Sequence, residues 1–258
     1  MSELVESARM KWRKKGKIAI LTLNRPRILN AIDYQATLDL DRVAEEIAKQ
    51  HDVRVVVIRG AGRSFSTGID LKALSSNRIE MPYYERWECA LRIFETMDKI
   101  VIAAIKQYCL GGGLQLALAC DVRVASQDAI FGLPATKEGL IPGLGTWRLP
   151  HYIGLGRAKR YVLSGENIRA KRALDMGLVD YVVSSKDYER RVEAIANRYV
   201  KVCSVGAIQA KLMVNQSYDL HYNQFFTKYL EAQQIAQASD DHYEARKAYI
   251  ENRDPVFK

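Results

Sequence analysis

Two kinds of hydrophobic run alternate along the first half of the chain. Short, largely β-branched runs, typical of strands buried in a parallel sheet, lie at 17–24, 53–59, 100–105 and 122–125. Between the first and second runs, apolar residues repeat at helical spacing: Leu40, Val43, Ala44 and Ile47. A second helical stretch, 83–97, lies between the second and third runs. Strands that alternate with helices in this way predict βαβ crossovers and an α/β core.

The pattern becomes mainly helical after about residue 145. Val192, Ile195, Ala196 and Tyr199 form one apolar stripe, and two further helical stretches lie between about 207 and 253. No repeat of 20–50 residues and no low-complexity linker interrupts the chain. We therefore expect an α/β core over residues 1–200 and a C-terminal helical region over 201–258.

The balance of charge is strongly basic. The 258 residues include 39 Lys and Arg against 30 Asp and Glu, a formal net charge of +9. Such an excess suits nucleic acid, an anionic membrane surface or a phosphate-bearing small molecule. No apolar run approaches the ~18–20 residues of a membrane span, and no RNP motif or array of stacking aromatics favours RNA. The basic stretch 11–15 runs directly into a strand pattern, which indicates the start of the fold rather than a targeting peptide.

Cysteine and histidine usage suggests neither disulfides nor a metal site. The four cysteines are far apart with no CxxC pair, so we expect a reducing, cytoplasmic location. The four histidines make no metal-ligand pair, and no metal site is expected.

Candidate chemistry lies in three loops that follow strands, at 65–72, 110–116 and 131–143. The second begins with three consecutive glycines, Gly111–Gly113, before an apolar helix. Such glycines let a ligand approach the backbone N–H groups, which suits a developing oxyanion. A lone glycine triplet is more often a tight strand–helix crossing, but a second glycine-containing loop shifts the balance because an oxyanion hole needs two donors. The spacing is not that of a dinucleotide-binding loop, and no Walker A lysine is present.

Together with the motifs at 21–26, 29–31, 164–166, 177–179 and 253–258, these loops make the chain similar to the crotonase superfamily, the enoyl-CoA hydratases and isomerases. The resemblance covers essentially the whole length. It implies a spiral core of repeated ββα turns followed by a helical trimerisation region, assembled as a trimer or a dimer of trimers. It also implies an acyl-CoA substrate, with coenzyme A as part of that substrate and no separate cofactor.

The resemblance assigns roles to individual positions. The two oxyanion N–H donors fall on Ile69 and Gly112, which would hold the thioester C=O. A neighbouring subunit's C-terminal helix would complete the coenzyme A site with Tyr249 and Arg253, although the usual lysine position holds Asn252. The adenine and phosphates of coenzyme A would lie along Arg27, Ile28, Ser66, Gly68, Asp70 and Leu71.

The chain departs from the family pattern at its acid–base residues. The two hydratase glutamates fall on Gln115 and Ala135, and the aspartate of some dienoyl-CoA isomerases and dehalogenases falls on Gly143. Glutamine can orient water but cannot take a proton near neutral pH. Glu138 would share a face with Ala135 if that segment is helical, and could then supply a carboxylate. The alternative is that Lys137 and Glu138 form a solvated pair at a helix start.

Several functions fit this pattern. The first is an acyl-CoA lyase or hydratase in which Glu138 is the acid–base group and Gln115 orients water. The substrate would then be an enoyl-CoA, with a cyclic or dienoyl one in view. The aromatic segment 81–87 suits a cyclic or aromatic acyl group, although aromatic helix faces are more often part of the core. The second is isomerisation, decarboxylation, or hydrolysis of a β-oxo or cyclic acyl-CoA, and the third is a non-catalytic protein that binds coenzyme A, RNA or a protein partner.

Overall fold

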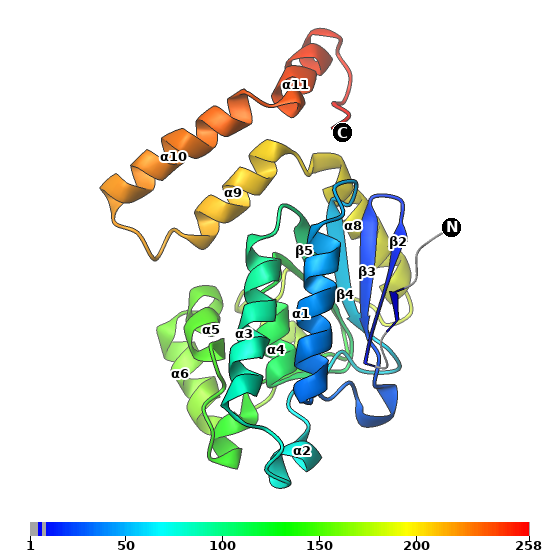
Figure 1. Cartoon of the computed structure of the whole chain (residues 1–258), viewed down its shortest axis with the longest axis vertical. Coiled ribbons are helices and arrows are strands. Elements are labelled where there is room, and N and C mark those ends of the chain that lie inside the picture. The colour runs from blue at the N-terminus through cyan, green and yellow to red at the C-terminus, as the bar shows by residue number, and fades with distance from the viewer. Residues whose placement is uncertain (1–4, 7–8, 258) are drawn as a thin grey trace.

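The computed structural model describes residues 5–6 and 9–257 and contains two β-sheets with helices around them (Figure 1). The smaller sheet has the order β6 (Tyr108–Leu110), β8 (Ile130–Gly132) and β9 (Ile168–Arg169). The larger, seven-stranded sheet has the spatial order β1 (Val5–Glu6), β2 (Met10–Lys15), β3 (Ile18–Leu23), β4 (Val55–Gly60), β5 (Ile100–Ile105), β7 (Val122–Ser126) and β10 (Tyr181–Val183).

The four strands predicted from β-branched runs are β3, β4, β5 and β7, and they lie side by side in parallel. Every residue of β5 is buried, as a strand covered on both faces requires. The basic stretch 11–15 belongs to β2, which pairs antiparallel with β3 across the turn at Gly16. The α/β core and the reading of this stretch as part of the fold are thus confirmed.

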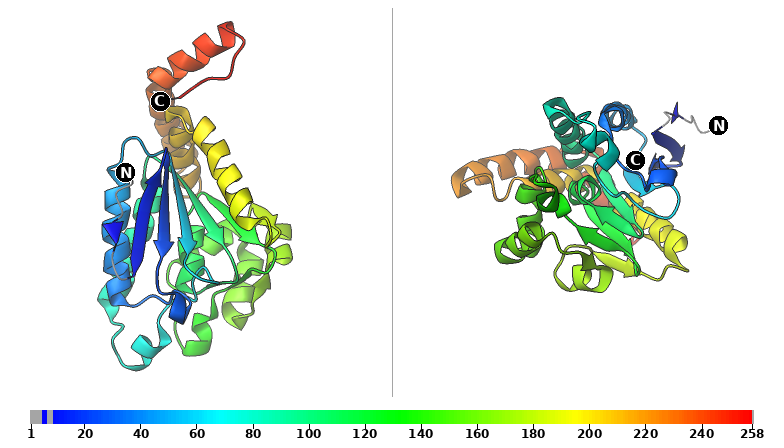
Figure 2. Two further views of the ribbon diagram at one scale, coloured as in Figure 1. Left: turned by 90° about the vertical axis from the view of Figure 1, so that its right-hand side faces the viewer. Right: turned by 90° about the horizontal axis from the view of Figure 1, so that it is seen from below.

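Alternate side chains of the large sheet enter two separate cores. On one face, Val56 and Ile58 of β4 pack in a cluster with α1 (Tyr34–Ala48) and α3 (Met81–Thr96). On the other face, Val55 and Val57 pack in a second cluster with α8 (Tyr188–Val202) (Figure 2). The helical stripes predicted at 40–47 and 192–199 are the faces by which α1 and α8 cover the sheet.

The small sheet and β10 are missed by the sequence analysis. These strands have only two or three residues each, too short to show a period, and β9 and β10 lie in the part of the chain expected to be helical. The expected change to a mainly helical chain after residue 145 therefore left out β9 and β10. The small sheet matters for the site, because β6 leads to the glycine triplet and β8 leads to the short 3₁₀ helix η2 (Pro134–Glu138).

Three C-terminal helices, α9 (Val205–Asn215), α10 (Tyr222–Gln237) and α11 (Asp240–Ile250), extend beyond the sheet (Figures 1 and 2). Lys211 attaches α9 to the core through an ion pair of 2.9 Å with Asp121. The shorter helices are α2 (Leu71–Ser75), α4 (Gly112–Leu118), α5 (Gly145–Ile153), α6 (Leu155–Ser164) and α7 (Ala170–Asp175). The helix break between Val202 and Val205 lies next to the predicted division at residue 200, which stays a prediction as a domain boundary.

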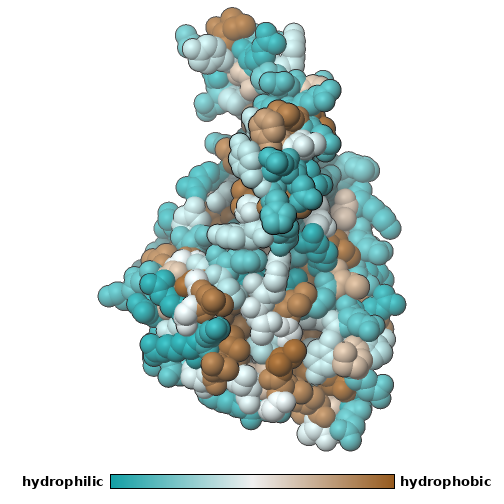
Figure 3. Space-filling model, turned by 90° about the vertical axis from the view of Figure 1, so that its left-hand side faces the viewer, coloured by the Kyte–Doolittle hydropathy of each residue, from teal (hydrophilic) through white to brown (hydrophobic). Residues whose placement is uncertain are grey.

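Apolar side chains are unevenly distributed on the surface. On the face that carries α5 and α6 they gather over the lower half (Figure 3). No helix of the described residues has the length and apolar character needed to cross a bilayer. The four cysteines form no disulfide, and the described part of the chain holds no cluster of three or more His, Cys, Asp or Glu side chains suited to a metal.

Candidate active site

Two of the three predicted loops lie against each other through strand-like hydrogen bonds. The amide of Ser66 donates to the carbonyl of Tyr108 over 2.9 Å, and the amide of Leu110 donates to the carbonyl of Ser66 over 2.9 Å. The hydroxyl of Ser66 donates to the Asn30 carbonyl over 2.8 Å and accepts from the Gly68 amide over 3.1 Å. These bonds fix the loop after β4 beside the loop that begins α4.

Two glycines make this close contact possible. Gly68 has φ +82°, and a Cβ there would lie 2.7 Å from both the Gly112 nitrogen and the Leu110 carbonyl oxygen. A Cβ on Gly113 would lie 2.7 Å from the Ser66 carbonyl oxygen. The tight-crossing interpretation of the glycine triplet therefore holds for Gly113, and the same approach of the two loops brings Ile69 and Gly112 to one cavity.

The amides of Ile69 and Gly112 have no protein acceptor within the described part of the chain. Gly112 is the first residue of α4, so its N–H has no carbonyl partner within the helix. Both residues line the same cavity. Two unpaired N–H donors at one cavity are what an oxyanion hole requires.

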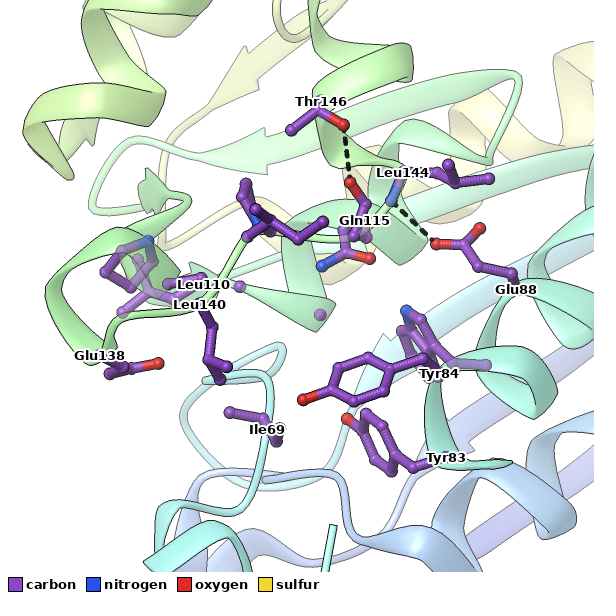
Figure 4. A pocket seen from close by; sticks show the side chains of 18 of the residues that line it. Ile69, Tyr83, Tyr84, Glu88, Leu110, Gln115, Glu138, Leu140, Leu144 and Thr146 are labelled. Atoms are coloured by element: carbon purple, nitrogen blue, oxygen red, sulfur yellow. Dashed lines mark hydrogen bonds between the residues drawn. The ribbon is translucent and has the colours of Figure 1, made fainter. Parts of the chain in front are cut away.

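This cavity has a volume of about 430 Å³ and is mostly apolar (Figure 4). Its walls come from the loop before α2, one face of α3, the start of α4, η2 and the loop before α5. The lining residues with aromatic or ionisable side chains are Tyr83, Tyr84, Trp87, Glu88 and Glu138. The aromatic segment singled out in the sequence thus lines this cavity.

Gln115 lies deep in the cavity with 8% of its surface exposed. Its side chain makes no hydrogen bond to another described residue. Its Oε1 is 2.8 Å from the position that a Cβ on Gly143 would occupy. The amide oxygen therefore borders the space that a side chain at 143 would enter, and the amide keeps its hydrogen-bonding capacity for a bound molecule.

Glu138 is the last residue of η2 and lines the cavity together with Ala135. Residues three apart share a face in a 3₁₀ helix, so the helical condition set by the sequence analysis is met. Partial burial raises the pKa of the Glu138 carboxyl above its ordinary value. Lys137 and Glu138 are both exposed, as the solvated alternative requires. No ion pair joins them among the described residues, and the Lys137 stem lies against Gly165.

Glu88 is a cavity residue that the sequence analysis missed. Its Oε1 accepts the Leu144 amide over 3.2 Å, and its Oε2 accepts from Nη1 of the buried Arg148 over 2.7 Å. In Figure 4, Glu88 and Glu138 lie on opposite sides of Gln115. Helical spacing could have pointed to Glu88, because it lies one turn after Tyr84 on α3 and shares the same helix face.

Most residues expected along coenzyme A lie around the same loops. Arg27 and Ile28 belong to η1 (Pro26–Ile28). The loop 65–72 lies beside this helix, because the Thr67 amide donates to the Leu29 carbonyl over 3.1 Å. Ile28 and Leu71 are exposed. Ser66 is fully buried, so only its backbone could meet a ligand.

Asp70 has a structural task. It caps α2 by accepting from the amides of Lys72 and Ala73, and it forms an ion pair of 3.2 Å with Arg25.

Tyr249 and Arg253 lie far from the cavity of their own chain. They belong to α11 and the turn after it, at the opposite end of the molecule from α2 (Figure 1). Tyr249 is 86% exposed, and Arg253 pairs with Glu244 and Glu251. A single chain does not bring them to the other site residues.

Comparison with known proteins agrees with this architecture. Residues 13–258 match the model of the family described as enoyl-CoA hydratase/isomerase. The chain is 34% identical to the short-chain-enoyl-CoA hydratase of Clostridium acetobutylicum, covering 93% of this chain and 94% of that protein. It is 31% identical to the crotonyl-CoA hydratase of Syntrophomonas wolfei, over 95% of each. A crystal structure of an enoyl-CoA hydratase from Geobacillus kaustophilus superimposes with a TM-score of 0.94 at 26% identity, covering 100% of this chain and 99% of that one. The expected crotonase fold is thereby confirmed, and the chain belongs to the enoyl-CoA hydratase/isomerase family.

Proposed function

We propose that the protein is an acyl-CoA lyase that adds water to, or eliminates it from, the C2=C3 bond of an enoyl-CoA, with Glu138 as its acid–base group. The observation that carries this proposal is one cavity that combines two free amides, those of Ile69 and Gly112, with a carboxyl of raised pKa at Glu138. The amides supply the oxyanion hole and Glu138 supplies the proton. Gln115 orients the water.

The steps in the hydration direction follow from these groups. The water oxygen bonds to C3 while the C2=C3 electron pair moves toward the thioester, whose oxygen becomes an enolate held by the two amides. Glu138 then gives its proton to C2, and the C=O bond reforms. The water has lost one proton, and a proton taken up from solvent restores Glu138, so the net change is the addition of H₂O. In the reverse direction Glu138 removes the C2 proton.

The acyl group that fits best is a flat or cyclic one. Tyr83 and Tyr84 meet edge to face with ring centroids 5.2 Å apart, and Trp87 lies one turn further along the same wall. Flat aromatic walls favour flat acyl groups by stacking and edge contacts. We therefore place a cyclic or dienoyl group ahead of a long flexible chain.

The coenzyme A moiety is proposed to lie outside the cavity, along Arg27, Ile28, Ser66, Gly68, Asp70 and Leu71. Tyr249 and Arg253 would reach it only from a second copy of the chain, because they lie at the far end of their own. The exposed apolar side chains of the C-terminal helices support such an assembly, a trimer or a dimer of trimers. They are Tyr222, Phe226, Tyr229, Leu230, Ile235, Tyr243 and Ile250.

Decarboxylation is the second candidate function, and the observation that favours it is the alanine at position 135. Loss of CO₂ from a malonyl-type thioester needs enolate stabilisation and no base to remove a proton, so replacing a family glutamate by alanine impairs it least. Isomerisation would need only Glu138, to move a proton between two carbons.

A panel of CoA thioesters separates these reactions. Saturated, enoyl, cyclic dienoyl, β-oxo and malonyl thioesters are incubated with the enzyme, and the products are read by mass spectrometry. A gain of 18 mass units on an enoyl thioester supports hydration, and a loss of 44 from a malonyl thioester supports decarboxylation instead. Calorimetry that detects no binding of any member would contradict both.

A further inference from the structure

We propose that Glu88 is the second carboxylate of the active site, the group that takes the proton from the attacking water. This inference rests on the proposed hydration, which leaves the acceptor of that proton unnamed. It starts from the cavity wall, because Glu88 lines the same cavity as Gln115 and Glu138 but comes from α3, an element that carries neither family glutamate position.

The position of Glu88 relative to Gln115 is defined by Gly143. A Cβ on Gly143 would lie 2.8 Å from Oε1 of Gln115 and 3.4 Å from Oε1 of Glu88. Both oxygens therefore border one point, where residue 143 contributes no side chain and has φ +50°. A carboxylate from α3 thus stands next to the place left empty by the glycine. The water that Gln115 orients would be within reach of it.

The carboxylate is held by two donors and still faces the cavity. The Leu144 amide fixes Oε1 and Arg148 fixes Oε2, while 22% of the Glu88 side chain remains exposed. Arg148 is buried and is itself held by Glu95 at 2.5 Å. This arrangement fixes the side chain without enclosing it, as a group that must meet water in one orientation requires.

The two carboxylates then divide the reaction between them. As the water oxygen bonds to C3, its proton passes to Glu88, and the enolate receives the proton of Glu138 at C2. Glu88 afterwards gives its proton to solvent and Glu138 takes one up, so that water alone has been added. Gln115, between the two in Figure 4, holds the water oxygen in line.

Two reactions of the same enzyme separate Glu88 from Glu138. Hydration of crotonyl-CoA needs both groups, whereas exchange of the C2 hydrogen of butyryl-CoA in D₂O needs the oxyanion hole and Glu138 alone. For Glu88→Gln we expect hydration to fall at least ~10²-fold, the usual contribution of a general base, with C2 exchange within about threefold of the wild type. Equal loss of both reactions, or loss of neither, would overturn the role of Glu88.

Glu95→Gln is the matched control. Glu95 pairs with the same buried Arg148 but does not line the cavity, so its loss disturbs the arginine without removing a group from the site. We expect both reactions of Glu95→Gln to stay within about threefold of the wild type. If its hydration falls as far as that of Glu88→Gln, the effect runs through Arg148 and the proposal is wrong. A wild-type enzyme that exchanges C2 hydrogen but hydrates no enoyl thioester would instead refute the proposed hydration.

Discussion

The proposed oxyanion hole depends on the absence of a side chain at Gly68. A Cβ there would lie 2.7 Å from the Gly112 nitrogen, so the first side-chain atom at position 68 would displace one of the two proposed donors. The motif spacing located both loops, because three glycines after a strand have few interpretations. The motif spacing could not locate Glu88, because its proposed role depends on the missing side chain at Gly143, which lies in the loop before α5.

Gly68→Ala should abolish most activity while the fold persists. Its Cβ would lie 2.7 Å from the Gly112 nitrogen, and loss of one oxyanion donor typically lowers kcat about 10²–10³-fold. The measurement is C2 exchange of butyryl-CoA, with circular dichroism to verify folding.

Gly16→Ala is the control for backbone strain. Gly16 also has positive φ, but a Cβ there meets nothing within 4 Å. Its exchange rate should match the wild type, and an equal loss in both variants would show that strain at positive φ, rather than the hole, is responsible.

The raised pKa of Glu138 predicts the pH dependence of C2 exchange. Glu138 must be ionised to remove the C2 proton, so the rate falls as pH drops through its pKa. Burial places that pKa above the ordinary value of 4.5, and the acid limb of log kcat/KM should therefore lie above 4.5. If the acid limb gives a pKa at or below 4.5, or if the limb persists in Glu138→Gln, the titrating group is not Glu138.

At the scale of elements, α3 and α5 are joined by a buried ion-pair network. Arg148 of α5 lies between Glu88 and Glu95 of α3, and none of this was visible in the hydrophobic pattern. That pattern predicted α1, α3, α8 and the parallel strands β3, β4, β5 and β7, because burial of alternate or every third to fourth residue leaves a period. Ion pairs between elements and strands of two or three residues leave none, which is why the network and the small sheet were missed.

Replacing Arg148 by methionine should destabilise the fold strongly. The buried Glu95 and the partly exposed Glu88 would both lose their partner, and breaking a buried pair such as Arg148–Glu95 typically lowers the free energy of unfolding by about 3–5 kcal/mol. Urea unfolding measures the change. Arg160→Met, which removes the exposed pair with Glu166, should change it by less than about 1 kcal/mol. Equal effects in the two variants would contradict the network's importance.

At the scale of the whole molecule, α10 and α11 lie at the end opposite α2, and the loop before α2 lines the cavity. The coenzyme A residues assigned by resemblance are thereby split into two groups, one beside the oxyanion loops and one on α11. A second copy of the chain is the simplest way to join them. The net charge of +9 does not decide this, because only a few basic residues lie near the proposed phosphate positions.

Light scattering should therefore give a mass about three or six times the 29.3 kDa of one chain. Phe226→Glu, which places a charge on the exposed apolar side of α10, should lower that mass and raise the KM for acyl-CoA. A wild-type monomer with full activity would contradict a shared coenzyme A site.

The central claim, that Glu138 supplies the acid–base chemistry beside an intact oxyanion hole, is tested most directly by one rate. This is the C2 hydrogen exchange of butyryl-CoA in D₂O, measured for the wild type, for Glu138→Gln and for Glu166→Gln, an exposed glutamate that lines no wall of the cavity. We predict rapid exchange by the wild type and by Glu166→Gln, and a loss of at least ~10²-fold in Glu138→Gln. Exchange by Glu138→Gln at the wild-type rate would contradict the claim.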